Sequence, residues 1–209
     1  MARFIGSVCR LCRREGTKLY LKGDRCFTDK CAIEKRAYPP GQHGSSFRQK
    51  MSEYGTQLRE KQKVKRVYSV LERQFRRFFA EAVRRKGMAG ENLLMLLEKR
   101  LDNVVYRMGF AASRNQARQI VGHGHILVNG KVATIPSMLL QMNDTVSVKE
   151  KSRSNVHIIS ALEASRRKGT FSWVEVDANA FTGKVVADPK REEITLPIQE
   201  QMIVELYSR

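Results

Sequence analysis

The sequence predicts an α+β protein with a cysteine-containing N-terminal extension, a mainly helical domain and an α/β domain. Three observations lead to this prediction. All four cysteines lie within the first 31 residues, apolar residues recur at helical spacing from Ser52 onwards, and an Asn-Gly pair joins two short apolar segments near residue 129. A chain of 209 residues is long enough to bury a hydrophobic core without covalent cross-links.

Basic residues are in large excess, mostly in the first half of the chain. There are 39 lysines and arginines against 21 aspartates and glutamates, a formal net charge of +18. Residues 1–100 hold 25 of the basic and 10 of the acidic side chains. Such an excess indicates a polyanionic partner, either nucleic acid or a membrane surface. No apolar stretch approaches the ~18 residues of a spanning helix, and the N-terminus lacks the apolar core of a signal peptide. We therefore expect a cytoplasmic nucleic-acid-binding protein without a membrane partner.

The cysteines follow the spacing C-x2-C-x13-C-x4-C, at Cys9, Cys12, Cys26 and Cys31. Two residues between a pair of thiolates allow both sulfurs to reach one ion, and a second pair can complete a tetrahedron. The spacing therefore predicts one structural zinc ion, which would hold the basic residues around it in place. Four unlinked thiols, a redox pair at Cys9 and Cys12, and an iron–sulfur cluster are the alternatives.

A connector rich in proline, glycine and serine, "YPPGQHGSS" from Tyr38 to Ser46, follows the cysteine-containing segment. From Ser52 the pattern becomes helical, with apolar residues at three- and four-residue spacing between Val67 and Ala82. A further helix is expected over Asn92–Met108, with an interruption near Glu98. The arginines between residues 73 and 84 lie mostly off the apolar stripe, so we expect them to face solvent or a partner.

Local signals become dense after residue 110. Ser113 and Gln116 fit the capping box of a helix that ends at Gly122. "HILVNGKV" predicts two strands joined by a tight turn at Asn129-Gly130, because this pair tolerates positive φ angles. "DTVSV", "FSWVEVD" and "FTGKVV" are expected strands, and Val156–Arg167 an expected helix. The segment "IQEQMIVELYSR" fits either a short helix or a strand.

Two basic segments, "LREKQKVKR" (58–66) and "ERQFRRFF" (72–79), follow the connector. A charged run alone is usually a solvated face, but with the basic cysteine segment and the charge asymmetry it favours phosphate contact. Arginine can grip a phosphate through two bonds and can stack on unpaired bases. The basic residues predicted to bind RNA here are Arg3, Arg10, Arg13, Arg14, Lys22, Arg25, Lys30, Arg36, Arg48, Lys50, Lys61, Lys63, Lys65, Arg66, Arg73, Arg76, Arg77 and Arg84.

The stretch "RLDNVVYRMGFAASRNQARQIVGHGHILVNGKV" combines arginines with amide and imidazole side chains around a helix and a hairpin, which suits a surface that reads RNA shape. Arg107, Arg114, Arg118, His123 and His125 lie around the expected helix and hairpin, with Asn115, Gln116, Gln119 and Asn129 as donors and acceptors between them. The "RLD" at its start is similar to a catalytic motif of pseudouridine synthases, so an RNA-modifying enzyme using Asp102 is the alternative. The sequence has no phosphate-binding glycine-rich loop, evident nucleophile–histidine pair or carboxylate cluster, and we expect no enzyme and no small-molecule substrate.

From end to end, the chain resembles the S-four family of bacterial small-ribosomal-subunit proteins. The resemblance is carried by "CRLCRREG", "YPPGQHG", the long stretch quoted above with "IPS" after it, and "IVELYSR". It implies a structural, primary binder of 16S ribosomal RNA that nucleates assembly of the subunit body and contributes to translational accuracy. It also implies contacts with small-subunit protein five, with other small-subunit proteins, and with messenger RNA near the channel where it enters.

The resemblance further implies a division of the chain. Residues 1–45 form a zinc-binding extension, which the family members that keep four cysteines are expected to share. Residues 46–98 form the helical domain, completed by about 185–209. Residues 99–184 form the α/β domain, with the S-four RNA-binding module over about Leu101–His157. The positions that match the motif of the module, and that the resemblance implies to bind RNA, include Arg107, Arg114, Gln116, Arg118, His123 and Asn129.

Overall fold

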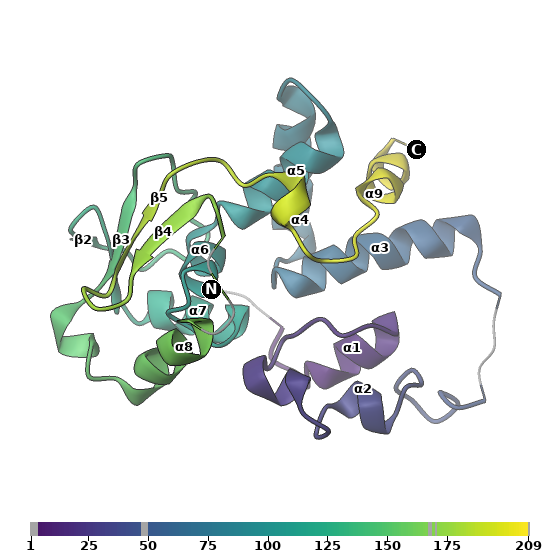
Figure 1. Ribbon diagram of the computed structural model, residues 1–209. Coiled ribbons are helices and arrows are strands. Elements are labelled where there is room, and N and C mark those ends of the chain that lie inside the picture. Colours follow the sequence, from purple (N-terminus) through teal and green to yellow (C-terminus); the bar gives the residue numbers. More distant parts are fainter. Residues whose placement is uncertain (1–3, 47–49, 167–168, 170, 209) are drawn as a thin grey trace. The chain divides into compact units, whose positions relative to one another are not determined.

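The computed structural model describes residues 4–46, 50–166, 169 and 171–208 (Figure 1). The described chain combines helices with an antiparallel sheet, which confirms the α+β class. It divides into two compact units, residues 1–93 with 196–209 and residues 94–195. The boundary between the units falls inside helix α5 (Ala89–Glu98).

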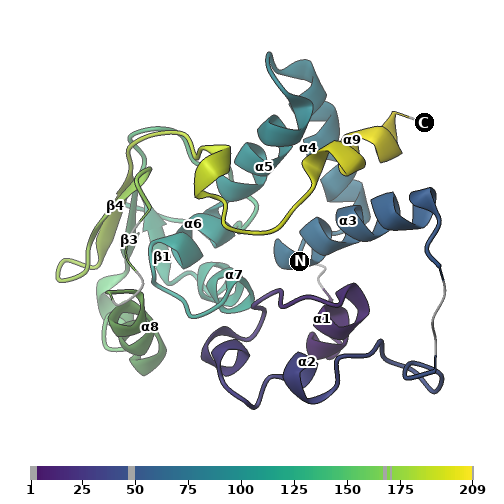
Figure 2. The same cartoon turned by 45° about the vertical axis from the view of Figure 1, so that its right-hand side comes forward.

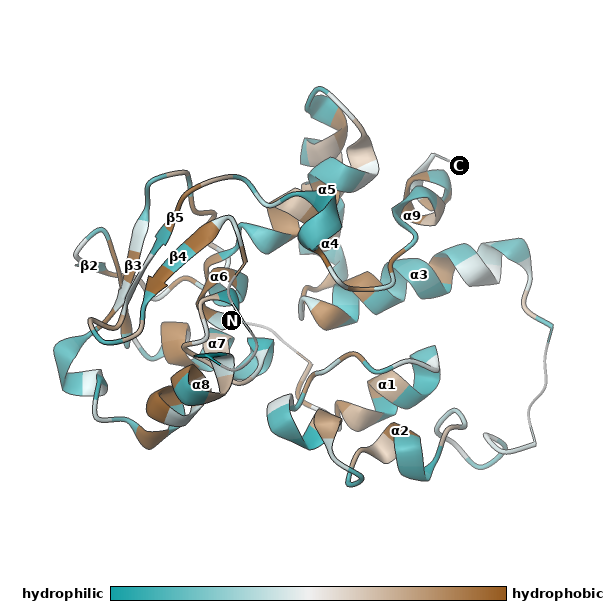
Figure 3. Cartoon of the chain, in the orientation of Figure 1, coloured by the Kyte–Doolittle hydropathy of each residue, from teal (hydrophilic) through white to brown (hydrophobic). Residues whose placement is uncertain are grey.

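The described part of the first unit is helical. Figure 3 shows that its longest helix, α3, is hydrophilic over most of its length and hydrophobic towards its C-terminal end, where Val64 and Val67 are buried. The elements of this unit before α5, and the one at the end of the chain, are α1 (Cys9–Glu15), the 3-10 helix η1 (Gly23–Phe27), α2 (Ala32–Lys35), α3 (Glu53–Val67), α4 (Glu72–Arg84) and α9 (Glu200–Tyr207).

The helical pattern after Ser52 corresponds to two helices. Ser52 caps α3 by accepting a hydrogen bond from the Gly55 N–H at 3.2 Å. The chain then turns at Ser69, whose φ is 52°, before α4 begins. Apolar spacing alone did not reveal this break, because the apolar stripe runs on from one helix into the next.

The ambiguous C-terminal segment forms the helix α9, and it packs against α3 and α4. Gln57 donates a hydrogen bond from Nε2 to Glu205 Oε2 at 3.1 Å. The ring of Tyr207 stacks on that of Phe79, with centroids 4.5 Å apart. The end of the chain is therefore part of the helical unit.

The second unit contains a five-stranded antiparallel sheet of order β2-β1-β3-β5-β4. The strands agree with the expected positions, and the helix predicted over Asn92–Met108 is interrupted after Glu98, as expected. The remaining elements are α6 (Leu101–Arg107), α7 (Arg114–Gly122), β1 (Ile126–Val128), β2 (Lys131–Val132), β3 (Thr145–Val148), η2 (Glu150–Ser152), α8 (Val156–Arg166), β4 (Val174–Asp177), β5 (Thr182–Val185) and η3 (Arg191–Glu193).

Two residues that tolerate positive φ angles form the turn of the hairpin that follows α7. Asn129 and Gly130 have φ angles of 49° and 79°, so both central residues adopt the left-handed conformation that a tight hairpin turn requires. The helix before it ends at Gly122, as predicted, but the glycine that reverses the chain is Gly124, with φ of 72°. The prediction that the helix ends at Gly122 is therefore confirmed, and the left-handed residue follows two positions later.

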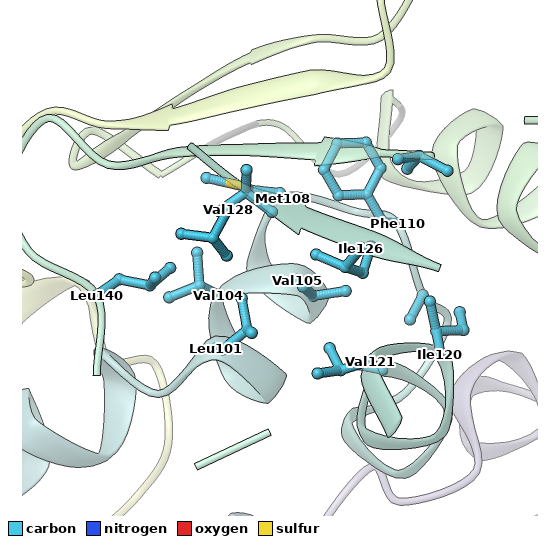
Figure 4. Packing of buried hydrophobic residues seen from close by; sticks show 14 of the residues in the cluster. Leu101, Val104, Val105, Met108, Phe110, Ile120, Val121, Ile126, Val128 and Leu140 are labelled. Atoms are coloured by element: carbon cyan, nitrogen blue, oxygen red, sulfur yellow. The ribbon is translucent and has the colours of Figure 1, made fainter. Parts of the chain in front are cut away.

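The hydrophobic core of this unit lies between α6, α7 and the sheet. Figure 4 shows Val104 and Val105 of α6 between that helix and Ile126 and Val128 of β1. Val104, Val105 and Ile126 are fully buried. The core therefore holds α6 and α7 rigidly beside the hairpin, which fixes the base of every side chain that these helices present.

Candidate nucleic-acid interface

Helix α4 presents an exposed arginine face. Its apolar side buries Phe75, Phe78 and Ala82, and the arginines lie on the opposite side of the helix. All of the arginines predicted on this helix are exposed, and the side chain of Arg76 retains 70% of its accessible surface although its Nε lies 3.3 Å from Glu72. The exposed residues of this face are Arg73, Arg76, Arg77 and Arg84.

The cysteine-containing segment presents a second group of exposed cations. Arg13 differs, because it donates to the carbonyl oxygens of Tyr38 at 3.0 Å and Pro39 at 3.3 Å, and its guanidinium lies 4.9 Å from the centroid of the Tyr38 ring. Arg13 thus fixes the connector to α1. The predicted RNA-binding residues that are exposed in this segment and in the chain just before α3 are Arg10, Arg14, Lys22, Arg25, Lys30, Arg36 and Lys50.

The basic residues of α3 are paired with carboxylates. Lys61 and Lys65 each lie 3.0 Å from a different oxygen of Glu72. Although burial raises it, hydrogen bonds from these two lysines lower the pKa of Glu72 to about 2. Lys63 pairs with Glu60 and donates to the Pro197 carbonyl at 3.1 Å, and Arg66 pairs with Glu15. These side chains hold helices together within the unit.

In the second unit, Glu98 gathers two of the predicted arginines into a buried cluster. Its carboxylate accepts hydrogen bonds from Arg107 Nε at 2.8 Å and Nη2 at 2.6 Å, and Arg114 Nη2 lies 3.7 Å away. Asn103 bridges the cluster, since it donates to Glu98 and accepts from Arg114 Nε at 2.7 Å. The two guanidinium groups also stack on aromatic rings, Arg107 on Phe171 at 4.3 Å and Arg114 on Tyr106 at 4.7 Å.

Asp102 forms the second buried cluster. It accepts hydrogen bonds from Arg100 Nε at 3.1 Å and Nη2 at 2.8 Å, and from Arg118 Nη1 at 3.1 Å. All three side chains are buried. This arrangement fits a structural role for Asp102, since its carboxylate is occupied by two cations in the interior.

The polar residues of the predicted RNA surface also support local structure. Gln116 accepts a hydrogen bond from the Ala112 N–H at 2.8 Å, while Ser113 accepts from the Gln116 N–H at 3.3 Å, a variant of the expected capping box. Asn129 donates to Asp144 at 2.8 Å and accepts from the Thr145 N–H at 2.9 Å. His123 is exposed beside the hairpin.

Arg3 and Arg48 lie outside the described residues. Most of the other predicted lysines and arginines fall into two groups, exposed cations in the first unit and buried or carboxylate-paired cations in either unit. Arg13 belongs to neither group, because it is bound to backbone carbonyls of the connector. Sequence reasoning missed the carboxylates Glu15, Glu72 and Glu98, which organise these cations. An isolated acidic residue within a basic segment is the only sequence signal that they carry.

The four cysteines line one small cavity of about 10 Å³ in the first unit, together with apolar residues such as Leu21 and Ile33. All four are free thiols, and all but Cys9 are buried. Burial raises the pKa of the Cys12 and Cys26 thiols, and the Lys22 N–H donates to Cys26 Sγ at 3.4 Å. In the part of the chain that the structure describes, no three histidine, cysteine, aspartate or glutamate side chains lie close enough together to form a metal-ligand set.

Two family models match the chain. The model described as "Ribosomal protein S4/S9 N-terminal domain" matches residues 3–98, and the model described as "S4 domain" matches residues 99–146. Proteins called "Small ribosomal subunit protein uS4" from Trichlorobacter lovleyi, Geotalea daltonii and Natranaerobius thermophilus are each 61% identical to it over 209 residues, the full length of both chains.

The chain belongs to the uS4 family of small-ribosomal-subunit proteins. This is a family of structural ribosomal proteins, so the expectation of a non-enzymatic role agrees with it, and the pseudouridine synthase alternative does not. The matched S4 domain begins at residue 99. Asp102 therefore lies at its start, and Glu98 lies directly before it. Among the described residues, no helix is long and apolar enough to cross a membrane.

Proposed function

We propose that this protein is a primary binder of 16S ribosomal RNA that nucleates assembly of the body of the small ribosomal subunit in the cytoplasm. Membership of the uS4 family supports the ribosomal role. The structural observation that carries the proposal is the exposed arginine face of α4, whose opposite side is anchored by buried aromatic residues. A rigid helix that holds several guanidinium groups in solvent is suited to phosphate contact.

The mechanism is electrostatic and conformational. Exposed lysines and arginines neutralise phosphates where RNA helices converge, and counterion release supplies much of the free energy of binding. Because the side chains are fixed on helices, they bind best to one arrangement of the RNA and shift its population towards that arrangement. The protein thereby stabilises a fold of the RNA without chemistry of its own.

Salt dependence tests this proposal. We expect the affinity for 16S RNA to fall steeply between roughly 50 and 200 mM salt, as six or more phosphate contacts require. Filter binding or fluorescence anisotropy with 16S RNA measures the slope, with an RNA of equal length and unrelated sequence as the control. A nearly flat dependence, or equal affinity for both RNAs, would reject the proposal.

We also propose that Cys9, Cys12, Cys26 and Cys31 hold one structural zinc ion. The support is the chemistry of the donor set: four thiols line one cavity, three of them are buried, and the Lys22 N–H donates to Cys26 Sγ. Among the described residues these side chains do not form a metal-ligand set, so zinc binding would draw the sulfurs together. When bound, the ion would cross-link a segment that has few apolar residues of its own. Zinc would then keep its exposed arginines in fixed positions.

Elemental analysis tests the zinc proposal, with an expected content of about one zinc per chain. Chelation should remove the metal and increase amide hydrogen exchange in residues 4–37, while exchange in residues 94–195 stays unchanged as an internal control. Metal-free protein with the N-terminal segment still protected would contradict the proposal.

We propose contacts with small-subunit protein five, with other small-subunit proteins and with messenger RNA near the channel where it enters, and through them a contribution to translational accuracy. The support is the resemblance to the family, together with a basic surface that can face RNA. Cross-linking of assembled subunits followed by mass spectrometry tests these contacts. Absence of cross-links to protein five in subunits that contain this chain would remove it from the set of partners.

A further inference from the structure

Glu15 is a buried carboxylate at the contact between α1 and α3. It is the last residue of α1, and its side chain retains 1% of its accessible surface. It pairs with Arg66 and lies 3.5 Å from Arg59 Nη1. The two arginines are seven residues apart, so they lie two turns apart on one side of α3. Both views show α1 running beside α3, within the same unit (Figures 1 and 2).

Such burial is unfavourable for a single carboxylate unless its partners are well placed. Burial raises the pKa of Glu15, whereas the positive charges of Arg66, Arg59, Arg14 and Lys63 act in the opposite direction. The pKa of Arg66 is lowered, chiefly by burial. One negative charge is thus enclosed by several positive ones, and it holds these together against their mutual repulsion.

The position of Glu15 links this cluster to the exposed cations of the cysteine-containing segment. Arg10 and Arg14 are exposed residues of the same helix, α1. Immediately after Glu15 the chain reverses at Gly16, whose φ is 67°. The orientation of α1 against α3 therefore depends on what holds its C-terminal end, and Glu15 is the residue at that end that pairs with arginines of α3.

We propose that Glu15 is a positioning residue for RNA binding, which fixes α1 and its exposed arginines against α3 by pairing with Arg59 and Arg66. This inference rests on the proposed RNA-binding function. Arg66, which we predicted to bind RNA, serves in this arrangement as part of the anchor. The anchor consists of the protein's own side chains, and it lies at the C-terminal end of the helix that also carries Cys9 and Cys12.

Replacing Glu15 distinguishes a positioning role from a simple effect of net charge, because the two predict opposite changes in RNA affinity. The variant Glu15→Gln raises the formal net charge from +18 to +19, so charge alone predicts tighter RNA binding. A positioning role predicts weaker binding, because the repelling arginines separate and α1 loses its fixed orientation. We expect the affinity for 16S RNA to fall about tenfold, a usual coupling within one salt-bridge network.

The matched control is Glu91→Gln, which makes the same charge change at an exposed residue of the same unit. We expect its affinity to be equal to that of the unchanged protein, or slightly higher. Both variants are measured by anisotropy on the same RNA at one salt concentration. If Glu15→Gln binds as tightly as Glu91→Gln, the positioning role is wrong, and if the unchanged protein does not bind RNA, the proposed function itself fails.

A second comparison covers the case in which Glu15→Gln loses structure throughout the unit. In the background Arg59→Gln with Arg66→Gln, the carboxylate has lost both partners, so adding Glu15→Gln should not weaken RNA binding further. An added loss of tenfold in that background would overturn the inference, because Glu15 would then act without the arginines. Hydrogen exchange of residues 4–37 is expected to rise in Glu15→Gln, and rescue by Glu15→Asp is expected to be partial because the shorter side chain cannot reach both guanidinium groups.

Discussion

The arginines of α4 and those around α6 and α7 have the same chemistry but opposite surroundings. On α4, Arg73, Arg77 and Arg84 are exposed, and aromatic residues bury the other side of the helix. In the second unit, the predicted arginines are buried, and each has a carboxylate within 4 Å. One set is available to a partner, whereas the other set stabilises the protein.

This difference shows what decides the role of a basic residue. Glu98 and Asp102 lie at or near the ends of short helices, where their carboxylates can accept hydrogen bonds from several chain segments at once. In α4, the carboxylates of Glu72 and Glu81 lie on the helix surface; each pairs with an arginine four residues further on, and Glu72 also pairs with lysines of α3. The two sets of arginines therefore differ mainly in whether the neighbouring carboxylate is buried, and less in how many basic residues surround it.

The largest effect is expected at Asp102. The variant Asp102→Asn leaves Arg100 and Arg118 buried next to a neutral amide, so we expect a loss of about 3 to 5 kcal/mol in the free energy of unfolding. Urea denaturation followed by circular dichroism measures it. RNA modification is expected to be absent from the unchanged protein and the variant alike.

Asp188→Asn is the matched control in the same unit. Asp188 pairs with Lys99 at 2.6 Å, but 44% of its side-chain surface is exposed. We expect a change of no more than about 1 kcal/mol for this pair. Equal effects at Asp102 and Asp188 would show that the buried cluster does not stabilise the fold, and the comparison above would no longer hold.

The second prediction concerns the exposed set. Replacing Arg73, Arg77 and Arg84 together by alanine should remove about two to three phosphate contacts. The slope of the logarithm of the binding constant against the logarithm of the salt concentration should become shallower by about the same number. Each replacement should change the free energy of unfolding by no more than about 0.5 kcal/mol relative to the unchanged protein, because these side chains are exposed in the folded state. Anisotropy titrations at several salt concentrations and urea denaturation of the same samples provide both readings. A large loss of stability with an unchanged salt slope would assign these arginines to the fold.

Acidification tests the intermediate case, the partly exposed Glu72. Its pKa is about 2 in the folded protein and near 4.5 when unperturbed, so its contribution to stability is complete above pH 4.5. This contribution is lost as the pH falls from about 4.5 towards 2. We expect Glu72→Gln to be less stable than the unchanged protein at pH 7 and to approach it near pH 2 in denaturation experiments. A stability difference that stays constant over this range would contradict the ion pairs with Lys61 and Lys65.

The elements of the fold were largely accessible from sequence because their signals are local. The hairpin at Asn129-Gly130 and the cap at Ser113 depend on the conformational preferences of one or two residues. The short helices of the cysteine-containing segment gave no periodic signal, since α2 has four residues and α1 seven. The last segment could not be assigned until its packing against α3 was visible.

The candidate interface was less accessible, because pairing between distant residues has no local signal. Arg107 meets Glu98 across a helix break, and Arg66 meets Glu15 across 51 positions of sequence. A basic residue beside an acid in sequence was no guide, since Arg100 and Asp102 are buried while Arg76 and Glu72 are not. Composition therefore predicted a nucleic-acid partner, but only tertiary structure separates the side chains that are exposed from those that are enclosed.

The smallest effect is expected at Glu81, and its sign completes the comparison. Glu81 lies 3.4 Å from Arg85, the residue that directly follows α4, and both side chains are more than a third exposed. Such a pair contributes about 0.3 to 0.5 kcal/mol, so Glu81→Gln should leave unfolding nearly unchanged. RNA affinity should rise slightly, because a negative charge is removed from α4 while every helix stays in place.

Glu98→Gln, by contrast, should lower the free energy of unfolding, since it leaves Arg107 and Arg114 buried without their carboxylate. If both variants changed RNA affinity in the same direction and by the same factor, net charge and not placement would govern binding. Paired anisotropy and denaturation measurements on the two variants decide between these outcomes.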